Sequence, residues 1–481
     1  MPRVQRKYRK GEIIDVEITG FAFGGKGIAK VPTEQGDFTV FVQNSLPGQH
    51  VKARVIKCKN RFAECKLEAV VKPAPTEVEI PYQPIPGAPY ARLPIEEQLK
   101  LKEQTALELY KRIGNLEIAG IYEGMLASPM TWHYRNKMEY SFSAIGFDLA
   151  SAEEFDGFAL GFKHRGTWWK VENLDADSGL FDAELENGLK ELRQFFEASG
   201  LPPWHPPKRE GFYRFFVVRR SLHANKLLLN LVTTSDDLDQ FDTQGFIDLC
   251  VKIWGERIQG ILHTINDDKG ERVEARSGSS SVIYGEEKVI ERINGLDFEI
   301  SMSSFFQTNP KSAEKLYSLV VDFAGKPATE DAFLMDLFCG TGTIGQLLAK
   351  GSGAKVIGVD IVESSIEDAK ENAKRNGVEN VEFYAADAGK FLREYPEYIG
   401  KIDTIVLDPP RAGIAPKTLR KVIELGARRI VYVSCNPSTQ ARDAATLSEA
   451  GYEMKRLKLV DQFPHTSHVE AIAQFDKAWA N

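Results

Sequence analysis

The sequence predicts an α/β protein of three parts: an N-terminal β-barrel, a central α+β domain, and a C-terminal doubly wound, mostly parallel sheet. Three observations predict this. Short alternating runs separated by glycines fill residues 11–71, a pattern typical of a small barrel. Strands and helices mix over residues 120–300, and apolar strands alternate with helices beyond residue 330. We place the parts at residues 1–71, 95–300 and 301–481, with a proline-rich linker at 72–94.

The composition is that of an ordinary globular protein, with 43% hydrophobic and 27% charged residues in a chain of 481. No run approaches the roughly 18 apolar residues of a membrane span, so we expect none. The five cysteines, an odd number, disfavour a disulfide framework and indicate a reducing compartment, so we expect a cytoplasmic protein. The net charge of −7 does not suggest a nucleic-acid partner, but local basic groups can still bind one.

The N-terminal third offers several groups that could contact nucleic acid. Residues 1–10 hold five Lys or Arg, which form either a solvated tail or an arm that touches phosphates. Phe21, Phe23 and Lys26 could stack on or pair with RNA, although single aromatics in such a barrel are more often core residues. The prolines of the linker forbid regular structure there, and apolar spacing then predicts a helix over 95–112.

The C-terminal part carries the motifs with chemistry. We expect its parallel strands at 333–338, 355–359, 381–385, 402–407 and 428–433, and an antiparallel pair at 453–460 and 468–475. Asp408-Pro409-Pro410-Arg411 follows the fourth strand, and Ser434-Cys435-Asn436-Pro437 follows the fifth. Neighbouring parallel strands would deliver both motifs to one edge of the sheet.

A glycine turn follows the first parallel strand. Residues 340–345 satisfy G-x-G-x-x-G, and Asp360 stands twenty positions after Gly340, at the end of the next strand. This spacing is compatible with a dinucleotide site, so an oxidoreductase stays open as an alternative. Asp336 precedes the turn, where a carboxylate would repel a pyrophosphate but attract an amine. S-adenosylmethionine has an amine, a ribose and no phosphate, so it fits both acids.

Cys435 is the strongest candidate for a nucleophile. A buried cysteine is commonly structural, but this one stands at a strand end before a helix that we expect to start at residue 438 or 439. A helix N-terminus lowers the pKa of a thiol from its usual value of about 8.5. Asp387 ends another strand and could accept from an adenine amino group. The three-residue spacing of His465 and His468 in an extended chain disfavours zinc, so we expect no metal site.

Together these motifs resemble the RNA uracil-C5 methyltransferase family. The resemblance covers residues 301–481 and rests on Phe306-Gln307-Thr308-Asn309, the 336–342 turn, the motifs at Asp408 and Cys435, and His468-Val469-Glu470. The segment 18–29 with 40–42 and 47–49 similarly resembles a TRAM domain, an OB-like RNA-binding barrel. The resemblance implies a Rossmann-like class I methyltransferase domain that uses S-adenosylmethionine and acts on RNA.

The resemblance also implies residue roles. Cys435 would add to C6 of uracil, and Glu470 would remove the C5 proton. The cofactor and catalytic pocket would be lined by Gln307, Phe338, Asp360, Asp387 and Asp408. Because TRAM barrels occur in rRNA-modifying members, we expect 23S rRNA as substrate, with tRNA as the nearest alternative.

One departure from the family pattern concerns iron. Some rRNA-modifying members hold an iron–sulfur cluster through three cysteines in the linker and one in the middle domain. Residues 81–90 and 173–177 contain no cysteine, so we predict no cluster. We expect the protein to act as a monomer. A dinucleotide-dependent oxidoreductase and a non-catalytic RNA-binding protein are the more distant alternatives.

Overall fold

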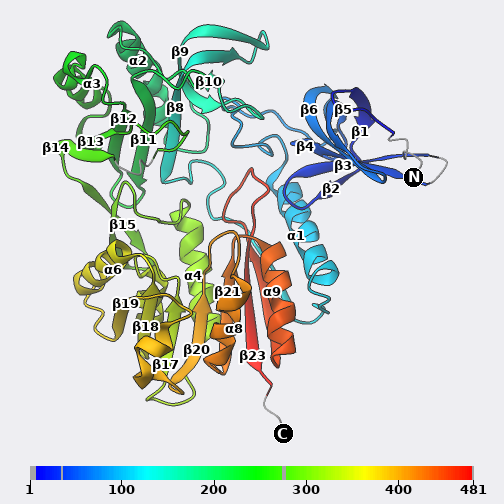
Figure 1. Ribbon diagram of the computed structural model, residues 1–481, viewed down its shortest axis with the longest axis vertical. Helices are drawn as coiled ribbons and strands as arrows, with labels where there is room; N and C mark the ends of the chain where they lie inside the picture. The colour runs from blue at the N-terminus through cyan, green and yellow to red at the C-terminus, as the bar shows by residue number, and fades with distance from the viewer. Residues whose placement is uncertain (1–6, 34–35, 274–277, 479–481) are drawn as a thin grey trace.

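The computed structural model describes residues 7–33, 36–273 and 278–478. The chain forms three bodies: the barrel, a central sheet with its helices, and a larger C-terminal sheet (Figure 1). Of the basic stretch 1–10, residues 1–6 lie outside the described ranges. No helix in these ranges is both long and apolar enough to cross a membrane.

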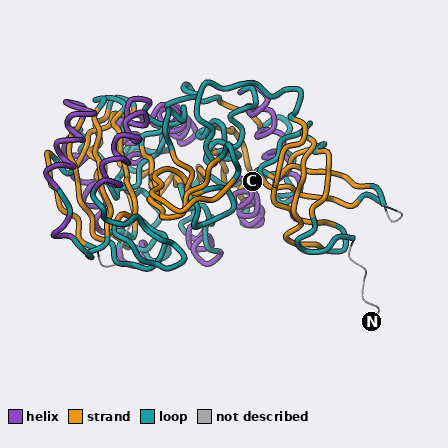
Figure 2. The backbone as a smooth tube through the Cα atoms, turned by 90° about the horizontal axis from the view of Figure 1, so that it is seen from above, coloured by secondary structure: helices purple, strands orange, loops and turns teal. Residues whose placement is uncertain are grey.

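The barrel is a six-stranded sheet at one end of the molecule (Figure 2). Its strands follow the order β1-β5-β6-β4-β3-β2, and alternate side chains point into one core. The strands are β1 (Ile13–Glu17), β2 (Gly20–Ala22), β3 (Lys26–Val31), β4 (Phe38–Gln43), β5 (His50–Cys58) and β6 (Phe62–Lys72).

The three barrel residues that we considered for RNA contact are engaged within the protein. Phe21 packs edge-on against Tyr90 of the linker, with ring centroids 5.4 Å apart. Phe23 packs against the core of the C-terminal sheet, and Lys26 forms an ion pair with Glu64 at 3.2 Å. The two aromatics therefore anchor the barrel to its neighbours.

Beyond Lys72, the last residue of β6, the linker has no helix or strand, as its prolines predict, but it is not a free spacer. Tyr90 and Leu93 are buried. Gln83 donates its side-chain amide to the carbonyl of Asn173, at 2.7 Å, and its backbone N–H to that of Asp177. Gln83 therefore attaches the linker to the central domain, and Tyr90 and Leu93 pack with Leu46 of the barrel.

The central domain is a seven-stranded sheet in the order β10-β9-β8-β11-β12-β13-β14. Helices α2 (Ala183–Ala198) and α3 (Thr243–Trp254) cover one face and share an aromatic-rich core with it. The strands are β8 (Lys137–Asp148), β9 (Glu153–Lys163), β10 (Val171–Asn173), β11 (Tyr213–Ser221), β12 (Lys226–Thr233), β13 (Ile258–Ile265) and β14 (Ser279–Gly285). Short 3-10 helices lie at Leu238–Gln240 and Gly255–Arg257.

The C-terminal sheet has the order β19-β18-β17-β20-β21-β23-β22-β7. Its strands up to β21 are parallel, and β23 runs antiparallel to both of its neighbours, as predicted for the last pair. The strands are β17 (Phe333–Leu337), β18 (Lys355–Asp360), β19 (Val381–Ala385), β20 (Ile402–Leu407), β21 (Arg429–Ser434), β22 (Tyr452–Val460) and β23 (Glu470–Lys477).

Helices cover both faces of this sheet, which makes it doubly wound. On one face lie α8 (Pro416–Glu424) and α9 (Pro437–Glu449), and on the other α4 (Pro310–Ala324) and α5 (Thr343–Ser352). Successive strand residues alternate between the two cores: Met335 and Ile405 face α8 and α9, and Leu334 and Val406 face α4 and α5. The remaining helices are α6 (Glu363–Arg375), α7 (Phe391–Glu394) and a 3-10 turn at Pro396–Tyr398.

Two elements that we assigned to the central domain, a helix and a strand, belong to the C-terminal sheet instead, and a third, a hairpin, contacts both parts. Helix α1 (Ile95–Arg112), whose bounds match the prediction, buries Ala106 and Tyr110 in the core beside α9. Strand β7 (Tyr122–Leu126) pairs with β22 as the edge strand of the sheet. The hairpin of β15 (Lys288–Ile293) and β16 (Leu296–Ser301) packs on α4. An amphipathic pattern shows which face of an element is buried but not which body buries it.

A buried ion pair fixes α1 to the C-terminal sheet. Lys102 Nζ lies 2.7 Å from Asp461 Oδ1 and 2.9 Å from the carbonyl oxygen of Phe463, and the two charged side chains are 1% and 0% exposed. Burial lowers the pKa of Lys102, and the Asp461 carboxylate opposes that effect.

We predict that Lys102→Met lowers the free energy of unfolding by about 3–5 kcal/mol, because it leaves the Asp461 charge buried without a partner. The double variant Lys102→Met/Asp461→Leu should stay within about 2 kcal/mol of the wild type, since both charges are replaced by apolar groups. Urea unfolding followed by circular dichroism measures both. Lys100→Met, an exposed position on the same helix, serves as the control. A single variant as stable as the double variant would contradict the prediction.

Candidate active site

The strand ends bring three predicted side chains together. Asp408 follows β20 and Cys435 follows β21, and these neighbouring parallel strands end at one edge of the sheet, as predicted. Because β23 runs antiparallel to β21, with Ser434 opposite Ala471, β23 begins where β21 ends. Its first residue, Glu470, therefore stands beside Cys435.

The predicted lowering of the Cys435 pKa is wrong. Cys435 does precede a helix, since α9 begins at Pro437 with Asn436 as its N-cap, but this position does not decide the pKa of the thiol. Burial, and then the charges of Glu470 and Asp408, raise the pKa of the thiol to about 11. The Arg411 guanidinium acts in the opposite direction but has a smaller effect. At neutral pH the thiol therefore holds its proton.

The two carboxyl groups next to the thiol are also perturbed. Burial, reinforced by Asp408, raises the pKa of Glu470 to about 8, and burial alone raises that of Asp408 to about 6. No described group donates a hydrogen bond to the Glu470 carboxylate. A carboxyl group with a pKa near neutral can both accept and release a proton at physiological pH, which suits a general base.

The glycine turn after β17 has an unusual backbone. Phe338 has a φ of +66°, a left-handed conformation that is uncommon for a non-glycine residue. Gly342 has a φ of +77°, and a Cβ there would lie 2.5 Å from the Phe383 ring. Asp360 Oδ2 accepts from the backbone N–H of Gly340 at 3.0 Å, which ties the end of β18 to the turn. No atom lies within 4 Å of the position that a Gly340 Cβ would occupy, so the turn leaves room for a ligand.

The surroundings of Asp336 show whether this turn fits S-adenosylmethionine. Its carboxylate is fully buried, and neither oxygen has a well-formed hydrogen bond, although the backbone N–H of Gly345 points toward it. Burial, and then the charge of Asp408, raise its pKa well above the usual value. A buried carboxyl group without a donor is unfavourable, and the amine of this cofactor would supply one. The residues present therefore fit the cofactor.

Tyr317 of α4 is a site residue that the sequence did not reveal. Burial, and then the charge of Asp408, raise the pKa of Tyr317 well above its usual value. The charges of Asp336 and Glu470 raise it further. Gln307 lies close enough to act on the same hydroxyl. The helical periodicity of α4 marks position 317 as core, and no pattern in the sequence separates it from its apolar neighbours.

The other predicted residues fall into two groups. Gln307 lies before α4. Its Oε1 accepts a hydrogen bond, at 3.4 Å, from Nε2 of Gln462, a residue of the segment that precedes β23. Asp387 lies beyond β19, and its Oδ1 accepts from the backbone N–H of Gly389 at 2.9 Å. Asp387 is thus on the side of the site formed by the glycine turn and Asp360, away from Cys435.

The histidines near Glu470 are structural. Burial lowers the pKa of His465 and of His468 to about 4, so both are neutral at physiological pH. His465 stacks on Trp132, with ring centroids 3.6 Å apart. Within the ranges that the structure covers, no three His, Cys, Asp or Glu residues are grouped to hold a metal ion.

Comparison with known proteins decides the family. A profile of tRNA (uracil-5-)-methyltransferases matches residues 254–477, and a TRAM domain profile matches residues 7–67. A protein of Clostridium acetobutylicum described as an uncharacterized RNA methyltransferase is 38% identical over 469 residues, covering 96% of this chain and 97% of its own. The chain belongs to the RNA (uracil-5-)-methyltransferase family.

Two further relatives extend the match over the whole chain. An uncharacterized RNA methyltransferase of Caldanaerobacter subterraneus is 37% identical over 473 residues, which cover 98% of this chain and all of that protein. The crystal structure of Pyrococcus abyssi tRNA (uracil-54, C5)-methyltransferase in complex with S-adenosyl-L-homocysteine superposes with a TM-score of 0.71. It is 27% identical, and the match covers 96% of this chain and 100% of that one.

Membership of the family settles the alternatives that the glycine turn left open. This methyltransferase is an enzyme that uses S-adenosylmethionine and acts on RNA. The dinucleotide-dependent oxidoreductase and the non-catalytic RNA-binding protein are therefore excluded. The α/β fold with a TRAM barrel is also confirmed.

We predict that Asp408→Asn lowers the pKa of Cys435, because it removes a negative charge that disfavours the thiolate. Alkylation of Cys435 by iodoacetamide at pH 8 should become roughly 3- to 10-fold faster, equivalent to about half to one pKa unit. Peptide mass mapping identifies the product, and the other four cysteines are buried. Asp387→Asn, which removes a charge on the far side of the site, should leave the rate unchanged. An unchanged rate in Asp408→Asn would contradict the electrostatic account.

Proposed function

We propose that this protein methylates C5 of a uridine in 23S rRNA through a covalent bond between Cys435 Sγ and C6 of the base. The observation that carries the proposal is the position of Glu470, which begins β23 beside the end of β21 and so stands next to Cys435. A thiol and a buried carboxyl group with a pKa of about 8 supply the two functions that the reaction needs.

Cys435 acts first. Its thiol releases its proton to solvent, and the thiolate attacks C6, which places the electron pair of the C5–C6 double bond on C5 and O4 as an enolate. S-adenosylmethionine, when bound, supplies the methyl group for C5. Since burial and two carboxylates hold the thiol pKa at about 11, substrate binding must favour the thiolate, and Arg411 already acts in that direction.

Glu470 completes the reaction. Its carboxylate accepts the proton from C5, the C5–C6 double bond re-forms, and the bond between C6 and Sγ breaks to release the thiolate. Glu470 must be ionised to accept this proton, so its raised pKa favours turnover at pH values above about 8. We assign Asp408 a role in positioning and binding within the pocket, and not in removal of the C5 proton.

The remaining predicted residues would hold the cofactor. Asp336 would pair with its amine, and Asp360 at the end of β18 would accept from the ribose hydroxyls. Asp387 would accept from the adenine amino group, and Phe338 and Gln307 would line the space between the glycine turn and α4. This assignment places the adenosine half near β18 and β19 and the amino acid half near Cys435.

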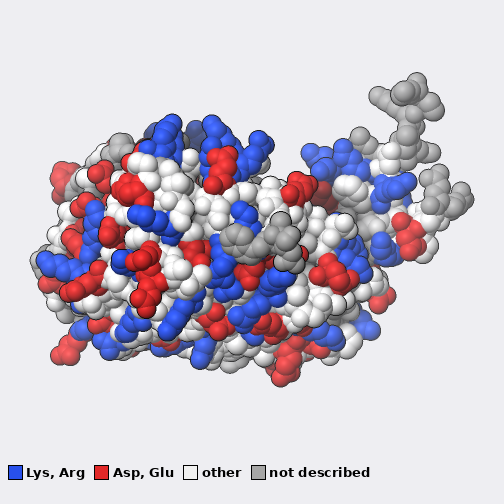
Figure 3. Space-filling model, turned by 90° about the horizontal axis from the view of Figure 1, so that it is seen from below, with Lys and Arg blue, Asp and Glu red and all other residues white. Residues whose placement is uncertain are grey.

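Two classes of RNA fit the proposal. Our first candidate is 23S rRNA, from the resemblance of the barrel to those of rRNA-modifying members. The second is tRNA, which is favoured by the likeness over the whole chain to a tRNA (uracil-54, C5)-methyltransferase. Figure 3 shows acidic and basic side chains mixed over this face of the molecule, the barrel included. Local groups rather than a net positive charge would then hold the RNA.

We predict that Cys435→Ala abolishes methyl transfer to RNA and the formation of a covalent complex with RNA that contains 5-fluorouridine. The nucleophile is missing, and alanine cannot replace it. Transfer of a radiolabelled methyl group and denaturing gel electrophoresis measure the two effects. Cys339→Ala, which changes another cysteine near the site, is the control and should still form the complex. Undiminished turnover by Cys435→Ala would exclude the covalent mechanism.

We predict that cells lacking this protein lose 5-methyluridine at one or more positions of 23S rRNA and keep it in tRNA. Mass spectrometry of nuclease digests from both RNA classes measures the loss. Re-expression of the wild-type protein, but not of Cys435→Ala, should restore the modification. Loss from tRNA alone would establish the second candidate.

A further inference from the structure

The loop between β22 and β23 is unusual for a hairpin connection. It comprises residues 461–469 and joins two residues that pair directly, Val460 and Glu470. Such loops ordinarily run over the surface. Here most of the loop is buried, including Asp461, Gln462 and His465. We call it the bridging loop, because its contacts come from every part of the protein.

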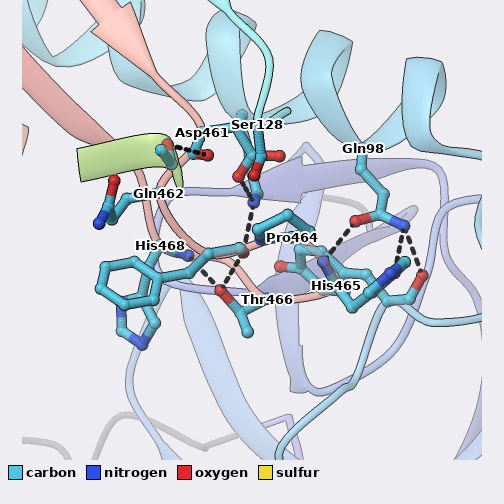
Figure 4. A network of polar contacts seen from close by, with 12 residues as sticks. Gln98, Ser128, Asp461, Gln462, Pro464, His465, Thr466 and His468 are labelled. Atoms are coloured by element: carbon cyan, nitrogen blue, oxygen red, sulfur yellow. Dashed lines mark hydrogen bonds and ion pairs between the residues drawn. The ribbon is translucent and has the colours of Figure 1, made fainter. Parts of the chain in front are cut away.

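Five consecutive carbonyl oxygens of the bridging loop accept hydrogen bonds from four separate segments. Figure 4 shows loop residues 461, 462, 464, 465, 466 and 468, with Gln98 of α1 beside His465. The segments are the start of α4, helix α1, the central domain and the linker. In order from residue 461 to residue 465, the donors are Ser312 Oγ, Asn309 Nδ2, Lys102 Nζ, Tyr134 Oη and the backbone N–H of Tyr90, at 2.9–3.1 Å. An ordinary turn satisfies its carbonyls with its own backbone or with water, so this loop is held by the rest of the molecule.

His465 receives the densest set of contacts. Gln98 Nε2 donates to its Nδ1 at 3.0 Å, and Gln98 Oε1 accepts from its backbone N–H at 2.8 Å. Trp132 of the central domain stacks on its ring. Its φ of +64° is a left-handed conformation, which persists only where surrounding contacts determine it.

The barrel reaches the same loop. A Cβ on Gly25, in the turn between β2 and β3, would lie 3.0 Å from Tyr90 Oη and 3.1 Å from Ser467 Cβ. The backbone of this turn therefore packs directly on the bridging loop and on the linker residue that bonds it. Phe21, one strand earlier, packs on the same Tyr90 ring.

Glu470 depends on this loop for its orientation. With no described group donating to its carboxylate, the direction of the side chain follows from the position of its backbone. That position is set by the strand pairing with Val460 on one side and by the last residues of the bridging loop on the other. Two parts of the protein expected to hold RNA, the barrel and the central domain, therefore determine where the carboxylate lies.

We propose that the bridging loop positions Glu470 for removal of the C5 proton, and that Trp132 and Gln98 are positioning residues through which the central domain and α1 hold the loop. The inference rests on the role proposed above for Glu470. It goes further by assigning to the RNA-binding parts a direct influence on the last chemical step, beyond delivery of the substrate.

The test separates the last step from the earlier ones. RNA that contains 5-fluorouridine traps the enzyme after attack by Cys435 and methyl transfer, because fluorine replaces the proton that Glu470 would remove. With Trp132→Ala, we expect this trapping to stay within about two-fold of the wild type, while turnover on uridine RNA falls on the order of ten-fold. Methylated uridine RNA should remain covalently bound to the variant on denaturing gels. Gln98→Leu, which removes both hydrogen bonds to His465, should give the same result.

Two reference variants make the outcome decisive. Glu470→Gln removes the base directly and should accumulate the same methylated adduct. Trp168→Ala removes a 49% exposed tryptophan from the same domain, whose ring contacts only Trp169 among the described aromatic groups, and it should accumulate none. If trapping and turnover fall in parallel in Trp132→Ala and Gln98→Leu without bound methylated RNA, or if turnover is unchanged, the loop has no positioning role. If Glu470→Gln itself accumulates no adduct, it is the proposed role of Glu470 that fails.

Discussion

The direction of one strand determines the chemistry of this site. Parallel strands present their carboxyl ends at the ligand edge of a doubly wound sheet, and here those ends supply Asp336, Asp408 and Cys435. The first residue of such a parallel strand would lie at the opposite edge of the sheet. Because β23 is inserted antiparallel between β21 and β22, its first residue, Glu470, comes to the same edge as the thiol. The pairing of nucleophile and base thus follows from topology.

The same closeness creates an electrostatic problem that the free protein leaves unresolved. Three carboxyl groups and a thiol share a region from which water is largely excluded. Burial disfavours the ionised form of all four groups, and the Asp408 carboxylate adds to this effect at Asp336, Cys435 and Glu470. At neutral pH the Cys435 thiol and most of the Glu470 carboxyl groups hold their protons, so the free protein presents a thiol and not a thiolate. A cofactor that carries positive charge matches these groups, and its arrival would relieve the repulsion and the unmet hydrogen-bonding capacity of Asp336 together.

Much of the fold could be predicted from the sequence, because apolar runs and turn residues report local structure directly. The strands of the C-terminal sheet, helix α1 and the meeting of Asp408 with Cys435 follow from such patterns. Quantities that depend on distant neighbours could not be predicted. The pKa of Cys435 reflects two carboxylates that fold against it. Helix α1 packs on a sheet whose strands come much later in the chain. Tyr317 has the helical spacing of a core residue, so its place in the site is not visible in the sequence. The polar residues of 461–469 suggest an exposed turn, and only the assembled protein shows that they are buried.

The place of α1 also constrains how the chain can fold. Lys102 pairs with Asp461, 359 positions later, and β7 pairs with β22, so these early elements have no partner until nearly the whole chain has been synthesised. Contacts of such sequence separation slow folding, and they leave an amphipathic helix and an unpaired strand edge exposed in the nascent chain. Residues 301–481, although they carry the chemistry, do not form a self-sufficient unit. A truncated protein that begins after β7 would expose the open edge of β22 and the apolar surface that α1 covers, and it would be prone to aggregate.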